Sequence, residues 1–511
     1  MKLVYYEIMK LIKKRLLQVL LVSLLMASAF LYYTEQRETE YISEYVMDIS
    51  DVISDMNGMS PETAAEYLTA RTEEIYVRQA LIYAEGDSAY SDTEVDYLKE
   101  IYPDAVERVM NSDEDYTESQ LRALSVAYDY LQSQAEYFAA YPVFLESINE
   151  NAENMLRFPV FAEKGSFEYR NILKTAADYE HIDSVDMDFG ISEGISSVTS
   201  FNMTDLCIII LSFAMCYYLF AYEHVNGLMS LIRSCSRGRY CTFWGKLAAL
   251  CISIVIMSGI FYGLEFTLSS IMYGYGNTDR LIQTMSAYRD SCVLISVRDY
   301  LITSAVIKTA VQICIGLFFT FVFTLMKSKM SAIYFISLAG LAGSWFLYRV
   351  VPSNFIFNHF KYINLFYYLD VNAIFSQYRN INFFTFPVNT LKLMPWFLFV
   401  ICGVFSILGL FTYVKSKNTS RNGLLSRTWD KISIVWRRQS KSVSVVLHEG
   451  YKAIVMGGAF VVILAVGLYG GVRSTQAQSI GIAQEDIPYK VYISSPISTC
   501  PPWMSFNTSF S

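Results

Sequence analysis

The sequence predicts an all-α polytopic membrane protein, with about seven transmembrane helices and a helical extracellular domain between the first and second spans. The chain has 511 residues, a mean hydropathy of +0.30 and only 17% charged residues, which is too apolar for a soluble chain of this length. Several apolar runs reach the ~20 residues that cross ~30 Å of hydrocarbon. Charge is also unevenly distributed, because residues 34–202 carry 36 of the 48 acidic residues and 10 of the 40 basic ones.

Apolar runs place the predicted spans along the chain. They lie at 16–33, 203–222, 247–273, 300–326, 330–351, 393–414 and 453–472. The run 330–351 is the weakest, because it contains two glycines and ends near Arg349. For the first run, an uncleaved membrane anchor is favoured over a cleaved signal peptide, since apolar residues continue past the candidate cleavage site Ala27-Ser28-Ala29.

Basic residues predict the orientation through the positive-inside rule. Four basic segments fall on one side of the membrane when the spans alternate. They are Lys10, Lys13, Lys14 and Arg15; Arg233, Arg237, Arg239 and Lys246; Lys327 and Lys329; and eight basic residues between Lys415 and Lys441. We therefore expect a multi-pass protein of the cell membrane with a cytosolic N-terminus and with residues 34–202 outside the cell.

Five parts are expected along the chain. They are residues 1–33, with a cytosolic interfacial helix and the first span; the acidic helical domain 34–202; the five-span domain 203–414; the basic cytosolic linker 415–452; and residues 453–511, with a seventh span and a short exported tail. The pattern Glu7-x-x-Lys10 before the first span recurs as Glu449-x-x-Lys452 before the last. This recurrence fits a second copy of the unit, and it also fits coincidence. The tail fits a truncated end as well as a disordered one.

Apolar spacing of three to four residues predicts helices in the extracellular domain at 63–83, 92–110, 118–141 and 143–156. Ser60 before Pro61 and Thr117 before Glu118 are the expected caps of two of them. The later loop 352–392 is rich in aromatic residues, so we expect it to lie on the membrane surface or re-enter the membrane.

The sequence lacks the common catalytic and ligand-binding motifs. There is no phosphate-binding Gly-x-x-x-x-Gly-Lys-Ser/Thr, no His-Glu-x-x-His and no Gly-x-Ser-x-Gly. No histidine has a second histidine three or four residues away, so zinc ligation is not expected. We expect no catalytic residue, no metal, no cofactor bound by this chain and no nucleic-acid partner.

The charged residues Glu265 and Lys308 lie well inside two of the predicted spans. Charges within a bilayer are costly and usually face a protein partner or water. The two side chains are expected either to pair or to line a transport path. The alternative is that Lys308 reaches outward to the interface while Glu265 is protonated or marks a shorter span.

The loop 223–246 between the second and third spans has the most informative sequence. Its apolar Leu228, Leu231 and Ile232 recur at helical spacing, and its arginines are expected to stay in water, so a short amphipathic helix on the inner membrane face is predicted. Its pattern is Glu…Gly…Leu…Arg-x-Arg…Lys, formed by Glu223, Gly227, Leu231, Arg237, Arg239 and Lys246.

This pattern between two spans, with a helix before the first span, resembles the permease subunit of ABC-2 type transporters. The large insertion after span one is similar to Gram-positive bacterial variants. The resemblance implies an exporter driven by ATP hydrolysis in a separate ABC ATPase subunit, and a second permease copy or half. It also implies that the ATPase docks on loop 223–246, through Glu223, Gly227, Leu231, Arg233, Arg237, Arg239 and Lys246. A seventh span departs from the six-span unit and leaves open a half-transporter or a clipped two-unit chain.

A different class of function stays open from the sequence. A membrane sensor or scaffold would use the exported helical domain to bind a ligand or a cell-envelope partner. A sensor usually needs a cytosolic output domain, and the longest predicted cytosolic stretch, 415–452, is short and basic. A scaffold would need no loop like 223–246.

Overall fold

Among the described residues, six helices are long and apolar enough to cross a membrane in this computed structural model. The structure describes residues 2–39, 45–56, 58–86, 97–112, 116–158, 163–182, 185–234, 238–326, 330–349 and 359–415. The six candidate spans are Arg15–Gln36, Glu193–Val225, Tyr240–Met272, Val297–Met326, Met330–Arg349 and Thr390–Lys415. They match the first six predicted spans, so the chain is a helical polytopic membrane protein. The predicted seventh span lies outside the described residues.

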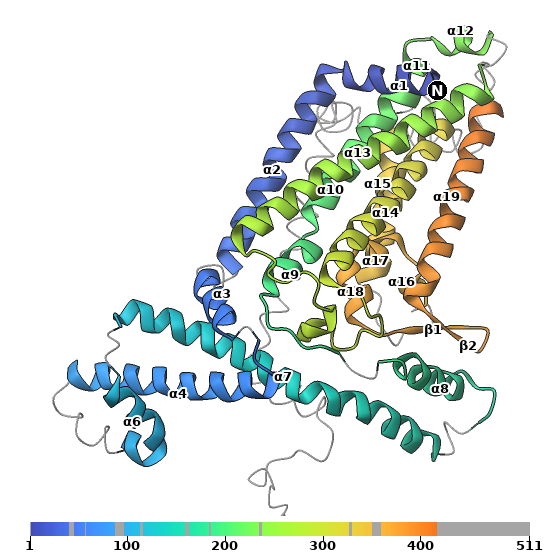
Figure 1. The fold of residues 1–511 in the computed structure, drawn as a ribbon. Helices are drawn as coiled ribbons and strands as arrows, with labels where there is room; N and C mark the ends of the chain where they lie inside the picture. Colours follow the sequence, from blue (N-terminus) through green and yellow to red (C-terminus); the bar gives the residue numbers. More distant parts are fainter. Residues whose placement is uncertain are drawn as a thin grey trace, which may run out of the picture. The chain divides into compact units, whose positions relative to one another are not determined.

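The helices of the bundle are joined by connections of very different lengths, the longest being the inserted helical domain between α2 and α9 (Figure 1). In chain order they are α1 (Lys2–Ile12), α2 (Arg15–Thr39), α9 (Glu193–Ser200), α10 (Met203–Cys216), the π-helical turn η2 (Tyr217–Ala221), α11 (Tyr222–Val225), α12 (Met229–Ser234), α13 (Tyr240–Met272), α14 (Val297–Met326), α15 (Met330–Arg349) and α19 (Thr390–Lys415). The second span is therefore composite, running from α9 to α11. We call the end of the bundle that carries α1 and α12 the α1 end, and the opposite end the α9 end.

Helix α14 lies at the centre of the bundle. It packs against α10, α13, α15 and α19, and most of its side chains are buried. Gly316 of α14 allows α13 to approach closely. A Cβ atom added at this glycine would lie only 2.5 Å from Cδ1 of Ile254 on α13, which is too close for two carbon atoms. The outer helices show the opposite pattern. On α2 the exposed residues Leu16, Val19, Met26 and Phe30 recur at helical spacing, as expected for a surface that faces lipid.

A helical domain is inserted between α2 and α9. It consists of α3 (Val46–Asp55), α4 (Pro61–Gly86), α6 (Pro103–Asn111), α7 (Glu118–Leu156) and α8 (Phe167–Tyr179). Its main core joins α3, α4 and α7 through buried Ile49, Leu68 and Leu131. A smaller core around Val77 and Leu98 packs α6 against α4. Helices were predicted at the positions of α4, α6 and α7 with somewhat different bounds, whereas α3 and α8 were not predicted.

The predicted caps are present in this domain. Ser60 Oγ accepts a hydrogen bond from the backbone N–H of Thr63. Thr117 and Gln120 form a reciprocal capping box at the start of α7. One boundary prediction was wrong, because 118–141 and 143–156 form a single helix. Pro142 removes one helical hydrogen bond, but α7 continues because its second half packs against α8.

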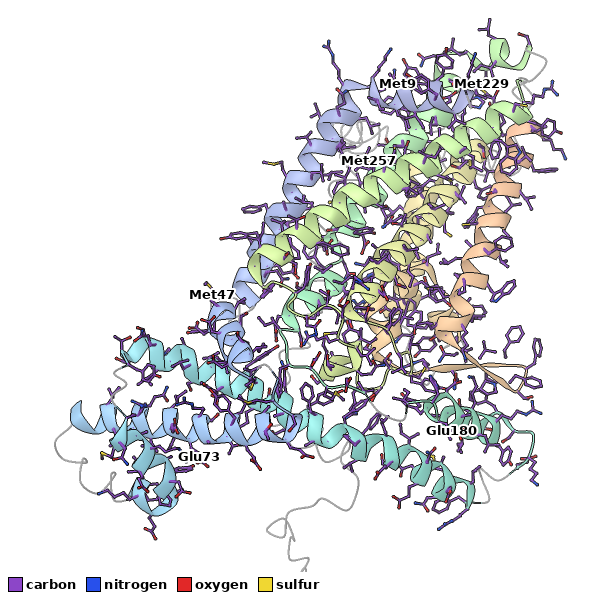
Figure 2. The ribbon with its side chains drawn as sticks, viewed as in Figure 1. Met9, Met47, Glu73, Glu180, Met229 and Met257 are labelled. Atoms are coloured by element: carbon purple, nitrogen blue, oxygen red, sulfur yellow. The ribbon has the colours of Figure 1, made fainter. Side chains whose placement is uncertain are left out.

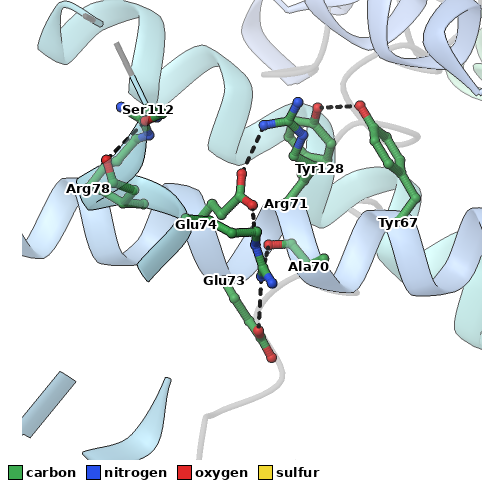
Figure 3. Close-up of polar contacts among 10 residues, drawn as sticks. Tyr67, Ala70, Arg71, Glu73, Glu74, Arg78, Ser112 and Tyr128 are labelled. Atoms are coloured by element: carbon green, nitrogen blue, oxygen red, sulfur yellow. Dashed lines mark hydrogen bonds and ion pairs between the residues drawn. The ribbon is translucent and has the colours of Figure 1, made fainter. Parts of the chain in front are cut away.

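Charged side chains link α4 to α6 (Figure 3). The buried carboxylate of Glu74 accepts from Arg71 at 2.8 Å and from Arg108 of α6 at 2.5 Å. Arg78 of α4 donates to the hydroxyl of Ser112 just after α6. The buried Glu74 carboxylate therefore has two charged partners, which limits the cost of burying it.

The helical domain contacts the connection between α13 and α14 at the α9 end of the bundle. Tyr137 of α7 donates to the carbonyl of Gln283, and Tyr179 of α8 donates to the carbonyl of Asp290. Both acceptors lie in the connection between α13 and α14, which also contains the short helices η3 (Ile282–Thr284) and η4 (Ser286–Tyr288). Since backbone carbonyls accept these bonds, the contact depends on the fold of that connection.

The loop 352–392 was predicted to lie on the membrane surface or to re-enter the membrane. In its described part, 359–392, the chain forms regular secondary structure. It contains α16 (His359–Tyr362), α17 (Leu365–Leu369), α18 (Val371–Ser376) and an antiparallel hairpin of β1 (Asn380–Phe383) and β2 (Phe386–Asn389). Phe384 and Thr385 have positive φ, as a tight two-residue hairpin turn requires. The hairpin is a small departure from the all-α prediction, and it packs against α8.

Candidate functional site

A buried ion cluster at the α1 end joins α1 to the second and third spans. One carboxylate oxygen of Glu223 lies 2.7 Å from Lys10 Nζ, and the other accepts a hydrogen bond from Lys246. Lys10 also lies 3.2 Å from Glu7, one turn earlier in α1. Lys246 is fully buried and Glu223 is 6% exposed. Two acids and two bases balance one another, so no charge in this cluster is left without a partner.

The helix before Glu223 supplies a second acceptor for Lys246. Residues Tyr217–Ala221 form a π-helical turn, a local widening of the helix that changes which backbone groups pair. Lys246 Nζ donates to the carbonyl of Leu219 in this turn at 2.6 Å. The turn therefore helps to satisfy an ammonium group that has no access to solvent.

Helix α1 lies directly on the start of α13. A Cβ added at Gly245 would lie 2.7 Å from Leu3 Cδ2, so the glycine permits this approach. Lys14, after α1, places its Nζ 4.1 Å from the ring centroid of Tyr222. Figure 2 shows Met9 of α1 and Met229 of α12 at the same end of the bundle. Helix α1 and the loop 223–246 therefore belong to one packed unit.

The cluster changes the acid–base behaviour of Lys10. Burial alone would lower the pKa of its ammonium group, but hydrogen bonds and charge attraction from Glu223 and Glu7 raise that pKa above its usual value. Lys10 therefore stays charged at physiological pH, and its contact with Glu223 is a charge-assisted hydrogen bond. Such a cluster is suited to holding helices together.

The residues that were predicted to bind an ATPase divide into two described groups. Glu223 and Lys246 are buried and bind each other, and Lys246 lies within α13. Gly227, Leu231 and Arg239 are exposed, and Leu231 is 70% exposed. Gly227 has a φ of +70°, which a turn between α11 and α12 requires. Arg237 and the side chain of Arg233 lie outside the described residues.

The predicted amphipathic helix is short. Helix α12 covers only Met229–Ser234. The side chain of its first residue, Met229, is buried, with 3% of its surface exposed. Leu228 just before it and Leu231 within it point outward, and Arg239 is exposed before α13. The loop therefore presents apolar and basic side chains together on a segment whose two ends are tied by the Glu223–Lys246 contact.

A second buried cluster lies inside the bundle. Lys308 Nζ of α14 is 3.2 Å from Asp205 Oδ2 of α10. Tyr262 of α13 donates to Asp205 Oδ1 at 2.6 Å, and Gln312 donates to the Asp205 carbonyl. The expected partner of Lys308, Glu265, lies near both ions and near the hydroxyl of Thr204, but it forms no ion pair with Lys308. The direct ion pair of Lys308 is therefore with Asp205.

Sequence reasoning missed three residues of the two clusters. Asp205 falls inside the predicted span 203–222, so the search that found Glu265 and Lys308 could have found it. Glu7 was noted only for the recurrence of Glu7-x-x-Lys10 at Glu449 and Lys452, which lie outside the described residues, and Lys10 was otherwise used only to predict the orientation. The i, i+3 spacing of Glu7 and Lys10 places them on one helix face, but no local signal identifies Glu223 as their partner.

Comparison of the chain with protein-family models, with curated proteins and with solved structures finds no match. Within the ranges that the structure describes, no group of three or more His, Cys, Asp or Glu side chains is arranged to hold a metal ion.

Proposed function

We propose that this chain is the permease subunit of an ABC-2 type transporter, an exporter of the cell membrane powered by ATP hydrolysis in a separate ABC ATPase subunit. In this proposal the N-terminus and the α1 end are cytosolic and residues 34–202 are extracellular. A second permease copy or half completes the pathway through the bilayer. The chain itself holds no catalytic residue.

The observation that carries the proposal is the tied loop at the α1 end. A soluble motor can move membrane helices only if its contact surface is mechanically connected to them. Glu223 and Lys246 connect the two ends of the loop, and Lys10 of α1 binds Glu223. Force applied to the loop would therefore reach the second and third spans together.

The structure changes the roles proposed for individual residues. Leu228, Leu231 and Arg239 are exposed and are proposed to contact the ATPase. Buried apolar side chains surrounded by polar ones commonly dominate the energy of such contacts. Glu223 and Lys246 are proposed to position this surface without touching the partner. Arg233 and Arg237 stay in the proposed contact set on sequence grounds.

Co-purification of the ATPase tests the proposal. Changing Leu228 and Leu231 to aspartate should remove most of the bound ATPase while monodisperse permease is still recovered. Met47→Asp is the matched control, because Met47 is 79% exposed and lies on α3 in the inserted domain. Equal ATPase recovery from the loop variant and the control would contradict the proposal.

One observation favours the alternative of a ligand-binding sensor or scaffold. A pocket of about 230 Å³ lies between α4 and α7 of the inserted domain. It is lined by Gln79, Ile82, Glu118, Leu121, Arg122, Ser125 and Val126. Loss of a ligand-dependent response in Arg122→Ala, with ATPase binding unaffected, would support this alternative.

A further inference from the structure

Glu265 of α13 is a buried carboxyl group without a hydrogen-bond partner. It is 3% exposed, and neither carboxylate oxygen accepts a hydrogen bond from a described residue. The titratable groups that face it come from every neighbouring element. They are Asp205 of α10, Lys308 of α14, Tyr32 of α2, Tyr262 of α13 and Tyr275 after α13.

The donors near Glu265 are directed at Asp205. Lys308 lies 3.2 Å from Asp205, and Tyr262 donates to the same carboxylate. One ammonium group balances one carboxylate, so the Asp205–Lys308 pair is already neutral. An ionised Glu265 would add an unpaired charge, without hydrogen bonds, to a site that water does not reach. A bound proton removes that charge.

A metal cation is a poor alternative ligand. The ammonium group of Lys308 in the same cluster repels a second cation, and the neighbouring carboxylate is already occupied. Hard cations also need several oxygen ligands at once. A proton needs only one carboxylate oxygen, which is what Glu265 offers.

A row of hydroxyl groups extends from Glu265 toward the α9 end. Ser269 is one helical turn after Glu265 on the same face of α13, and its Oγ lies 3.5 Å from Ser197 Oγ. Ser197 in turn lies 2.8 Å from the hydroxyl of Tyr32. The partly exposed Tyr275 bonds to the carbonyl of Phe266, the residue after Glu265. Ser269 and Ser197 both donate to the carbonyl of Gly194, and each hydroxyl oxygen can still accept a hydrogen bond, as a proton relay requires.

We propose that Glu265 is a proton-binding site inside the bundle, loaded from the α9 end past Ser269 and Tyr275. The proposal does not depend on the proposed transport function. At neutral pH the folded protein holds one proton on Glu265, beside the ionised Asp205–Lys308 pair. Separation of α10, α13 and α14 would admit water to Glu265, and the proton would then be released.

Infrared difference spectroscopy on the purified full chain tests the proposal. At neutral pH, the spectrum of the parent minus that of Glu265→Gln should show the C=O stretch of one protonated carboxylic acid, which shifts in D₂O. Glu118→Gln is the control, because Glu118 is exposed and should give no such band. Absence of the band from the Glu265 difference would overturn the proposal. Ser269→Ala should slow the shift in D₂O several-fold, and an unchanged rate would overturn the loading route.

A hydrophobic carbodiimide gives an independent measurement on the parent protein. The acid O–H adds across one C=N bond of the reagent, and acyl transfer to nitrogen gives an N-acylurea that retains every atom of both reactants. Peptide mass spectrometry should find this adduct on Glu265, falling as the pH is raised, and not on Asp205. An adduct on Asp205 alone would overturn the proposal. Protection by sodium chloride, but not by choline chloride, would assign the site to a cation and also overturn it.

Discussion

Lys308 Nζ lies 3.2 Å from Asp205 Oδ2, and this contact joins α14 to α10 inside the bundle. Both side chains are almost completely buried. Tyr262 adds a hydrogen bond to the same carboxylate from α13, so three spans meet at Asp205. A site that joins three membrane helices controls whether they move as a unit.

A double-mutant cycle on Asp205 and Lys308 should show strong coupling. Asp205→Asn or Lys308→Met alone leaves one buried charge unpaired, which costs about 3–5 kcal/mol of stability, and the double variant should lose less than the sum. Detergent-solubilised unfolding, followed by tryptophan fluorescence, measures each value. The same cycle with Glu265→Gln in place of Asp205→Asn should give weaker coupling. Stronger coupling of Lys308 to Glu265 than to Asp205 would contradict the structure.

The ion cluster at the α1 end predicts an order of effects. Glu223→Gln removes the negative charge that both Lys10 and Lys246 contact and replaces one acceptor oxygen with an NH₂ group, whereas Lys10→Met leaves the Glu223–Lys246 contact in place. We expect Lys10→Met to cost about 1–3 kcal/mol, the range for a charge-assisted hydrogen bond, and Glu223→Gln to cost more. Thermal unfolding of the purified variants measures the order. If Lys10→Met is as destabilising as Glu223→Gln, the cluster is not centred on Glu223.

The positions of the spans could be predicted because they depend on local properties. The length and composition of each apolar run decide whether it can cross a bilayer, and six predictions agree with the structure. The caps at Ser60 and Thr117 are equally local, since the bonding groups lie three residues apart. By contrast, α7 continues past Pro142 because of its contacts with α8, which are not visible in the local sequence.

The clusters could not be predicted in the same way. The expected partner of Lys308 was Glu265, because both lie well inside predicted spans. Asp205 is only the third residue of the predicted span 203–222, but the observed span begins at Glu193 and places Asp205 well inside the bundle. Glu223 and Lys246 were expected in a solvated loop, but α13 begins at Tyr240 and buries Lys246 within its second turn. The distribution of basic residues gives an expected orientation in the membrane, but it does not indicate which charged side chains form ion pairs.

Oxidation should connect α14 to α19 without any mutation. Cys314 Sγ and Cys402 Sγ lie 2.9 Å apart, and both thiols are free. A membrane-permeant oxidant should remove one hydrogen from each thiol and form a disulfide, which non-reducing peptide mapping detects. Cys314→Ser should abolish the linked peptide. A parent protein in which Cys314 and Cys402 stay reduced, while other cysteines form linked pairs, would contradict the packing of α14 on α19.

The contact of α8 with the hairpin region should weaken in acid. Burial would raise the pKa of Asp178, but Lys174, Tyr378 and Lys392 together hold it below its usual value. A lowered pKa stabilises the fold above the unfolded value of about 3.9, and this contribution is lost as the pH falls further. The melting temperature of the parent should therefore exceed that of Asp178→Asn at pH 7, with the difference shrinking below about pH 4. Glu180→Gln, at an exposed neighbouring position, should show no such difference.

The proposed orientation can be tested with an exposed native cysteine. Cys241 is exposed at the start of α13, and Glu118 is exposed at the start of α7. With Cys241 as the sole cysteine, a membrane-impermeant maleimide should label it only after the cells are permeabilised. In a cysteine-free background, Glu118→Cys should react in intact cells, because 34–202 is proposed to be extracellular. Size-exclusion chromatography confirms that both variants are folded. Labelling of Cys241 in intact cells, with Glu118→Cys protected, would reverse the topology and place loop 223–246 where no cytosolic ATPase can reach it.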